Sequence, residues 1–357
     1  MIDFALDDEL ALLRDTTRDF GASWLHPRER EHEAARTVAP EVRETFAEIG
    51  LAGLELPEEL GGAEMGALAR VLVLEELGAA DAGAALDLDP LGPAFYGLRA
   101  LGAERLREFL PALLREPGAR AVLVVGDALE VRGDRVHGSV PWVPADRVDL
   151  LVSLGREEIL LVQEGIEREA VRGAGLRCAG ASSVVLDGAP LRARLRDPQA
   201  SADALARARL YVAALLVGVM RAAADTSRAY ALERVTFGRP IAHHQSLAFL
   251  IADMASAVEG SRLLVQEAAW RLERGLDTSE ACATAFLEAV EQSMFVTPNG
   301  IQILGGHGFM QDYPLEKWMR DARALGLLLG GADAAREEAG AELAADDGPV
   351  ELSVPEA

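Results

Sequence analysis

The order of hydrophobic and polar residues divides the chain into three regions. In residues 1–118, apolar residues recur at the spacing of amphipathic helices, as in the stretches 6–13 and 42–51. From residue 196 onward the helical spacing returns in three long stretches, 204–235, 246–274 and 279–297. The region between them contains short apolar runs separated by Gly, Asp and Pro, which is typical of strands, at 121–125, 129–131, 148–152, 159–162 and 184–186.

This order of helices, strands and helices predicts an α+β chain. We expect an N-terminal helical domain at 1–118, a middle β domain at 119–195 and a C-terminal helical bundle at 196–340. The last stretch, 341–357, is acidic, contains Gly and Pro and lacks periodicity, so we expect a disordered tail. The longest apolar run, around 210–220, is shorter than the ~18 residues of a membrane span, which favours a buried helix.

Composition narrows the choice of partners and compartment. The 58 acidic and 35 basic residues give a net charge of −23, which disfavours nucleic acid and anionic membranes as partners. The start of the chain is acidic, unlike a signal peptide. Two distant cysteines, Cys178 and Cys282, could form one disulfide but are more typical of a reducing cytoplasm, so we expect a cytoplasmic protein. No HExxH or CxxC pattern occurs, so we expect no metal site.

Two stretches carry candidate chemistry: residues 230–245 read YALERVTFGRPIAHHQ, and residues 301–309 read IQILGGHGF, followed by PLEKWMRDA at 314–322. In the first, Arg234 can pair with a phosphate and Phe237 can pack on a planar ligand. In the second, the backbone N–H groups of Gly305 and Gly306 can face an anion. Each feature alone is usually a solvated arginine or an ordinary turn, but the combination favours a ligand site.

These stretches resemble the FAD-binding segments of acyl-CoA dehydrogenases. Residues 50–62, GLAGLELPEELGG, are similar to the family's N-terminal helical domain, and residues 175–189 resemble the end of its β domain. The resemblance implies an N-terminal helical domain, a middle β-barrel or sheet domain and a C-terminal four-helix bundle, usually in a tetramer with FAD across a dimer interface. The residues that it implies at the FAD are Arg234, Thr236, Phe237, Ile241, His244, Gln245, Gln302, Gly305 and Gly306.

The sequence departs from the family at the catalytic base. The family reaction removes a proton next to a thioester carbonyl, usually with a glutamate. The two positions where the family carries this glutamate correspond to Leu329 and Ala208, and neither side chain can accept a proton. Glu233 falls at a helix end and Glu291 would need an alignment gap, so we expect no catalytic residue on this chain.

The middle domain departs as well and is shorter than usual. It lacks the Thr-Glu-Pro-x-x-Gly-Ser-Asp-like stretch of the family. At the Trp-(Ile/Val)-Thr/Ser stretch, which lies beside the flavin ring in the family, this chain has Trp142, Val143 and Pro144, and proline offers neither a hydroxyl nor an N–H. We interpret Trp142 as a core residue.

The chain thus keeps a half-site for a neighbour's FAD and lacks its own ring pocket and base. It resembles the subunit without the base in the α2β2 acyl-CoA dehydrogenases of actinobacterial steroid side-chain and cholesterol degradation, a branch of lipid metabolism. We therefore expect a subunit of a heteromeric FAD-dependent acyl-CoA dehydrogenase that is inactive alone and whose homologous catalytic partner binds most of the acyl-CoA. Three alternatives stay open: a flavin monooxygenase of the same fold, a homomeric dehydrogenase with a relocated base, and a scaffold without flavin.

Overall fold

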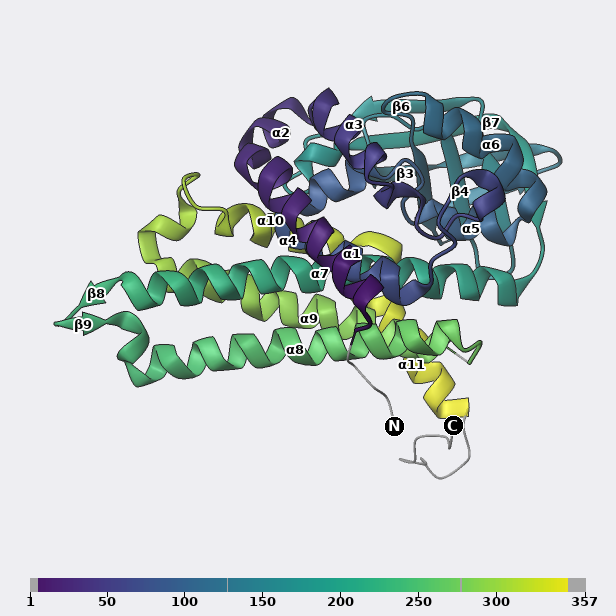
Figure 1. Cartoon of the computed structure of the whole chain (residues 1–357). Helices are drawn as coiled ribbons and strands as arrows, with labels where there is room; N and C mark the ends of the chain where they lie inside the picture. The colour runs from purple at the N-terminus through teal and green to yellow at the C-terminus, as the bar shows by residue number, and fades with distance from the viewer. Residues whose placement is uncertain (1–5, 127, 277, 346–357) are drawn as a thin grey trace.

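The computed structural model describes residues 6–126, 128–276 and 278–345 and contains three parts (Figure 1). The N-terminal part is helical: α1 and α6 carry their apolar residues on one face, whereas α4 is apolar and buried on all sides. Its helices are α1 (Asp8–Phe20), α2 (Glu29–Ala35), α3 (Pro40–Glu48), α4 (Ala67–Leu88), α5 (Ala94–Ala100) and α6 (Ala103–Arg115).

The middle part is a curled sheet in the order β1-β4-β5-β7-β3-β2, with β6 also paired to β7. The long strand β7 connects the two halves, because its end pairs with β5 while its beginning pairs with β3 and β6. The strands are β1 (Ala121–Val125), β2 (Leu129–Arg132), β3 (Arg135–Val143), β4 (Leu150–Leu154), β5 (Ile159–Val162), β6 (Ile166–Ala170) and β7 (Ser182–Leu195).

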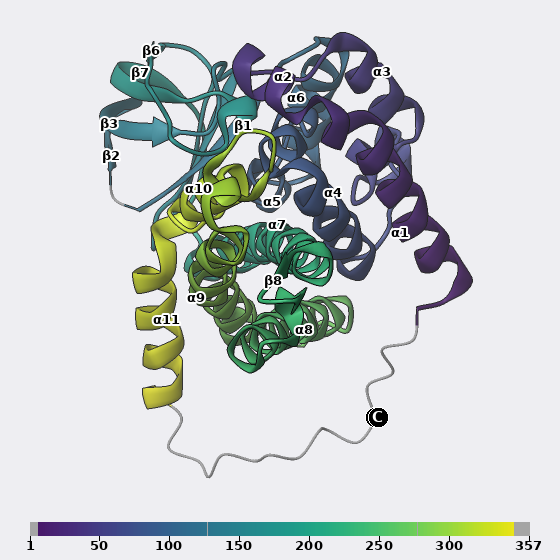
Figure 2. The ribbon, with the colours of Figure 1, turned by 90° about the vertical axis from the view of Figure 1, so that its left-hand side faces the viewer.

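The C-terminal part is a bundle of long helices seen end-on in Figure 2. Helices α7, α8 and α9 pack on one another, and α10 and α11 pack on α9. A two-stranded hairpin, β8 (Val235–Thr236) with β9 (Arg239–Pro240), joins α7 to α8 and projects from one end of the bundle (Figure 1). The helices are α7 (Pro198–Glu233), α8 (Gln245–Glu273), α9 (Ser279–Leu304), α10 (Leu315–Leu325) and α11 (Gly331–Ala345).

The predicted fold class is therefore confirmed: an α+β chain with helical, sheet and helical domains. The apolar run at 210–220 lies inside α7, buried against α4. The two helices cross closely, since a Cβ on Gly78 would lie 2.4 Å from the Leu215 carbonyl oxygen and one on Gly218 would lie 2.1 Å from that of Glu75. Among the residues that the structure describes, no helix combines the length and apolar character needed to cross a membrane.

Three sequence expectations need correction or limits. The helix predicted to end at residue 297 continues through Pro298 to Leu304, because the buried packing of this segment outweighs the one backbone hydrogen bond that proline removes. Part of the predicted tail, 341–357, belongs to α11, whose Ala- and Glu-rich sequence favours helix up to Ala345; residues 346–357 lie outside the described residues. Cys178 and Cys282 are both buried and free, so the disulfide alternative is wrong.

Candidate cofactor-binding site

The hairpin after α7 has a tight turn at its tip. Phe237 and Gly238 occupy the two central positions with φ of +52° and +79°, the left-handed pair that a two-residue type I′ turn requires. Glycine adopts this conformation freely, whereas a bulky residue is strained in it. The Phe237 side chain is 96% exposed, so contacts within the described part of the chain do not account for that strain.

A cleft of about 370 Å³ lies between the end of α7, the hairpin and the end of α9. Five of the nine predicted FAD residues line it: Arg234, Thr236, Ile241, Gly305 and Gly306. They come from segments far apart in the sequence, which the packing of α7 on α9 brings together.

The two glycines leave the floor of this cleft open. Gly305 has φ of +60° and ψ of −132°, a conformation that only glycine adopts easily, and it ends α9. No atom lies within 4 Å of the place where a Cβ would stand on Gly305 or Gly306. A ligand can therefore approach the backbone here closely, as the sequence motif suggested.

The other four predicted residues lie outside the cleft lining. Gln302 is exposed on α9, and Gln245 is exposed at the first turn of α8. Phe237 and His244 form an edge-to-face ring pair with centroids 6.2 Å apart. They stand together at the hairpin, beside the cleft rather than within it.

His244 holds a buried donor without a partner. Arg239 Nη2 lies 3.1 Å from His244 Nδ1, and because arginine only donates, Nδ1 accepts and the neutral ring carries its hydrogen on Nε2. That Nε2 atom is buried and has no hydrogen-bond partner. The Arg234 guanidinium likewise forms no ion pair with another residue that the structure describes. Free cationic and N–H donors next to open glycine backbone suit a phosphate-bearing dinucleotide such as FAD.

Three aromatic residues of the cleft wall escaped the sequence prediction. The Tyr230 hydroxyl lies 3.0 Å from His307 Nδ1, and the rings of His307 and Tyr313 stack with centroids 5.5 Å apart. Tyr230 and His307 line the cleft, whereas Tyr313 lies outside the lining and stacks on His307. Tyr230 and His307 lie within the two sequence motifs, and their aromatic rings were the signal that could have marked them as part of the site.

The two positions assigned to the catalytic base are both buried. Ala208 is 0% exposed and Leu329 is 7% exposed. Arg209 Nη2 donates to the Leu329 carbonyl oxygen at 3.4 Å and to Glu338 Oε1 at 3.2 Å. Arg209 thus binds the Leu329 backbone, and neither Leu329 nor Ala208 offers a proton acceptor in its side chain.

The other carboxylates and the tryptophan considered from sequence lie elsewhere. Glu233 is exposed at the end of α7, and Glu291 forms an ion pair with Arg336 on the surface. Trp142 is half-buried and packs against the main hydrophobic core, in line with its interpretation as a core residue. Within the described ranges, no group of three His, Cys, Asp or Glu side chains could hold a metal ion.

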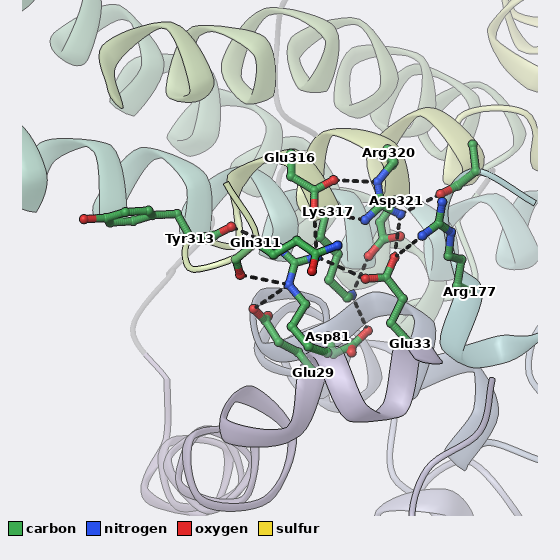
Figure 3. A network of polar contacts seen from close by, with 12 residues as sticks. Glu29, Glu33, Asp81, Arg177, Gln311, Tyr313, Glu316, Lys317, Arg320 and Asp321 are labelled. Atoms are coloured by element: carbon green, nitrogen blue, oxygen red, sulfur yellow. Dashed lines mark hydrogen bonds and ion pairs between the residues drawn. The ribbon is translucent and has the colours of Figure 1, made fainter. Parts of the chain in front are cut away.

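A buried polar network joins the N-terminal and C-terminal domains beside the cleft (Figure 3). The Lys317 ammonium lies 2.8 Å from Asp81 Oδ1 and 2.7 Å from Asp321 Oδ2. Burial alone would lower the pKa of Lys317, but the charges of Asp321 and Asp81 outweigh it and raise that pKa. Burial raises the pKa of nearby Glu29 to about 7, against the opposing charge of Lys317.

Large apolar side chains are exposed at the same end of the bundle. Phe237 stands at the hairpin tip, Phe249 on α8 is 60% exposed, and Phe309 after α9 is 70% exposed. Leu232 and Met310 are exposed beside them. We call these five residues the apolar end surface. Exposed apolar clusters of this kind mark places where a protein contacts a partner or ligand.

Known proteins similar to this chain point to one family. Residues 7–116 match the model for the N-terminal domain of acyl-CoA dehydrogenase, and residues 199–343 match that for its C-terminal domain. The chain is 31% identical to cyclohex-1-ene-1-carbonyl-CoA dehydrogenase of Geobacter metallireducens, over 89% of this chain and 93% of that protein. It is 26% identical to the short-chain specific acyl-CoA dehydrogenase of Clostridium acetobutylicum, over 90% and 94%.

Solved structures show the same fold. Butyryl-CoA dehydrogenase from Megasphaera elsdenii superposes with a TM-score of 0.84 at 23% identity, covering 96% of this chain and 100% of that chain. A variant of the Tcur3481–Tcur3483 steroid ACAD superposes with a TM-score of 0.81 at 27% identity, covering 94% and 98%.

Proposed function

Because this chain belongs to the acyl-CoA dehydrogenase family, we propose that it is one subunit of a heteromeric FAD-dependent acyl-CoA dehydrogenase. It contributes the half-site for the ADP side of FAD to a homologous catalytic subunit. That partner supplies the base and the pocket for the flavin ring, and it binds most of the acyl-CoA substrate.

The residues of this chain fit their share of the cofactor. Arg234 can pair with the pyrophosphate, and Gly305 and Gly306 leave backbone open to it. His244 Nε2 provides a buried donor that lacks an acceptor on its own chain. When bound, FAD supplies the acceptor for the hydrogen that leaves the acyl chain.

One observation carries the division of labour between subunits. At the helical rise of about 1.5 Å per residue, Ala208 and Arg234 lie about 39 Å apart along α7. No single extended dinucleotide reaches from the cleft at Arg234 to the position of the base at Ala208. The cleft of this chain therefore serves a flavin ring that lies over another chain.

The absence of a proton acceptor at Ala208 and Leu329 favours a different chain, rather than a second copy of this one, as that partner. A second copy would bring Ala208 and Leu329 to the flavin, and neither side chain can remove a proton. A homologous chain with a glutamate at either position completes the site. The apolar end surface gives such a chain a place to pack beside the shared cofactor.

The substrate proposal is a steroid side-chain acyl-CoA. It is supported by the subunit type inferred from the missing base and by the 27% identity to the steroid ACAD. The acyl group is desaturated between the carbons α and β to the thioester, as in the family reaction.

Co-expression with a homologous acyl-CoA dehydrogenase chain that carries a glutamate at either base position tests the proposal. FAD per polypeptide and acyl-CoA oxidation with an artificial acceptor are measured for each chain alone and for the purified complex. We expect half a flavin per polypeptide and turnover only in the complex. A lone chain that binds a full flavin and turns over acyl-CoA would refute the divided site.

A further inference from the structure

The loop that forms one wall of the FAD cleft packs on α9 at its start, whereas its second half depends on another domain. It runs from Gly305 to Pro314, between α9 and α10, and begins with the 3₁₀ turn Gly305–Phe309. Beyond the bonds within this turn, the backbone hydrogen bonds inside the loop are Met310 N to His307 O at 3.0 Å and Tyr313 N to Met310 O at 3.1 Å. Phe309 and Met310 are exposed. The second half of the loop, after the 3₁₀ turn, has few internal bonds of this kind, so support from elsewhere helps to keep it in one conformation.

Arg30, from α2 of the N-terminal domain, provides that support. Its Nε donates to the Gln311 carbonyl oxygen at 3.2 Å, and its Nη2 donates to the Tyr313 carbonyl oxygen at 3.0 Å. These two carbonyls hold the end of the loop on both sides of residue 312. The loop thereby has a fixed point on a domain that is distant in sequence.

Acidic residues fix the guanidinium itself. Arg30 Nη1 donates to Glu316 Oε1 at 2.6 Å and to Glu33 Oε2 at 3.0 Å. Figure 3 shows Glu33, Glu316 and Gln311 in one polar network that joins α2, α10 and the loop, whereas the Tyr313 ring points away from it. All three nitrogens of the group thus have acceptors, and only arginine offers donors in this planar arrangement.

The contact continues through rings into the cleft. Tyr313, whose carbonyl Arg30 holds, stacks on His307, and His307 lines the cleft beside Tyr230. The chain of contacts therefore runs from Arg30 to the Tyr313 backbone, to the His307 ring and to the cavity. No other described arginine donates to these two loop carbonyls.

We propose that Arg30 is a positioning residue for the cofactor half-site: it fixes the Gly305–Pro314 loop so that the cleft is formed before the dinucleotide arrives. This rests on the proposed function. Preformed sites bind more tightly because the cost of ordering the loop is met during folding. Arg30 itself does not touch the cleft.

The experiment compares Arg30→Ala with Arg320→Ala. Arg320 belongs to the same network, bonding Glu33, Glu316 and the Ala174 carbonyl oxygen, but not the loop carbonyls. Hydrogen exchange of residues 305–314 is measured by mass spectrometry on the lone full-length chain without FAD. The FAD dissociation constant is measured on the co-expressed complex, and the melting temperature of each variant reports general stability.

We expect Arg30→Ala to speed exchange in the loop and to weaken FAD binding about tenfold. Arg320→Ala should lower the melting temperature to a similar extent with loop exchange and FAD affinity close to wild type. Unchanged loop exchange in Arg30→Ala, or equal FAD losses in both variants, overturns the positioning role. Absence of FAD from the wild-type complex refutes the proposed function itself and is visible without either variant.

Discussion

Replacing Glu29 with glutamine tests the electrostatics of the buried network. The Glu29 carboxyl lies 3.9 Å from Arg30 Nε and 3.7 Å from His26 Nδ1, and its Oε2 is buried without a hydrogen-bond partner. Burial therefore raises its pKa from 4.5 to about 7. Glutamine keeps the shape of the side chain and cannot ionise.

The sign of the effect follows from this raised pKa. The folded state holds the Glu29 proton more tightly than the unfolded state, so this preference stabilises the fold at low pH and is lost as pH rises through about 7. A shift of this size corresponds to about 3 kcal/mol of unfolding free energy. The unfolding free energy of Glu29→Gln relative to wild type should therefore rise by about 2–3 kcal/mol as the pH increases from about 5 to about 8.

Urea unfolding followed by circular dichroism over this pH range measures the difference. Glu31→Gln is the matched control, because Glu31 is exposed on the same helix. A gap between Glu29→Gln and wild type that stays constant with pH, or grows toward acid, would show that the Glu29 carboxyl is not protonated in the fold near neutral pH.

Three further predictions concern the cleft and its support. Arg234→Ala in the complex should weaken FAD binding about ten- to a hundredfold by removing a charged donor, whereas Arg228→Ala, exposed on the same helix, should not; equal losses would contradict the role of Arg234. Lys317→Met leaves two buried carboxylates unpaired and should cost about 3–5 kcal/mol in urea unfolding, and a loss below about 1 kcal/mol would contradict the pairing. Gly308→Ala would place a Cβ 2.5 Å from the Ile301 carbonyl oxygen and should lower stability by about 1–3 kcal/mol, while Gly306→Ala, which has open space, should melt like the wild type.

The sequence predicted individual strands where the hydrophobic spacing was regular. The runs 121–125 and 159–162 coincide with β1 and β5, because both strands alternate with turns and are rich in β-branched or aliphatic residues. Strand β6 gave no such signal, because it lies at an edge and most of its residues are exposed and charged. Strand β3 contains Gly138 and Pro141 and has two register shifts, so its pattern is broken.

The candidate site was predictable only where it follows short motifs. Arg234, Thr236 and the two glycines could be proposed from local sequence, because each motif forms one turn at a helix end. Arg30 could not, since its contact with the Tyr313 carbonyl spans 283 positions and depends on the docking of two domains. Every residue has the same backbone carbonyl group, so no sequence pattern marks a carbonyl that an arginine binds.

The exposed aromatic tip of the hairpin has a consequence for the cell that makes this protein. Phe237 is almost wholly exposed to solvent, and much of the apolar end surface is exposed as well. Contact of these side chains with water is unfavourable until a binding partner covers them. Chains synthesised in excess would display this surface to chaperones and proteases, which remove proteins with exposed apolar segments. If the proposed heteromeric complex forms, the abundance of the partner subunit would then limit how much of this chain accumulates.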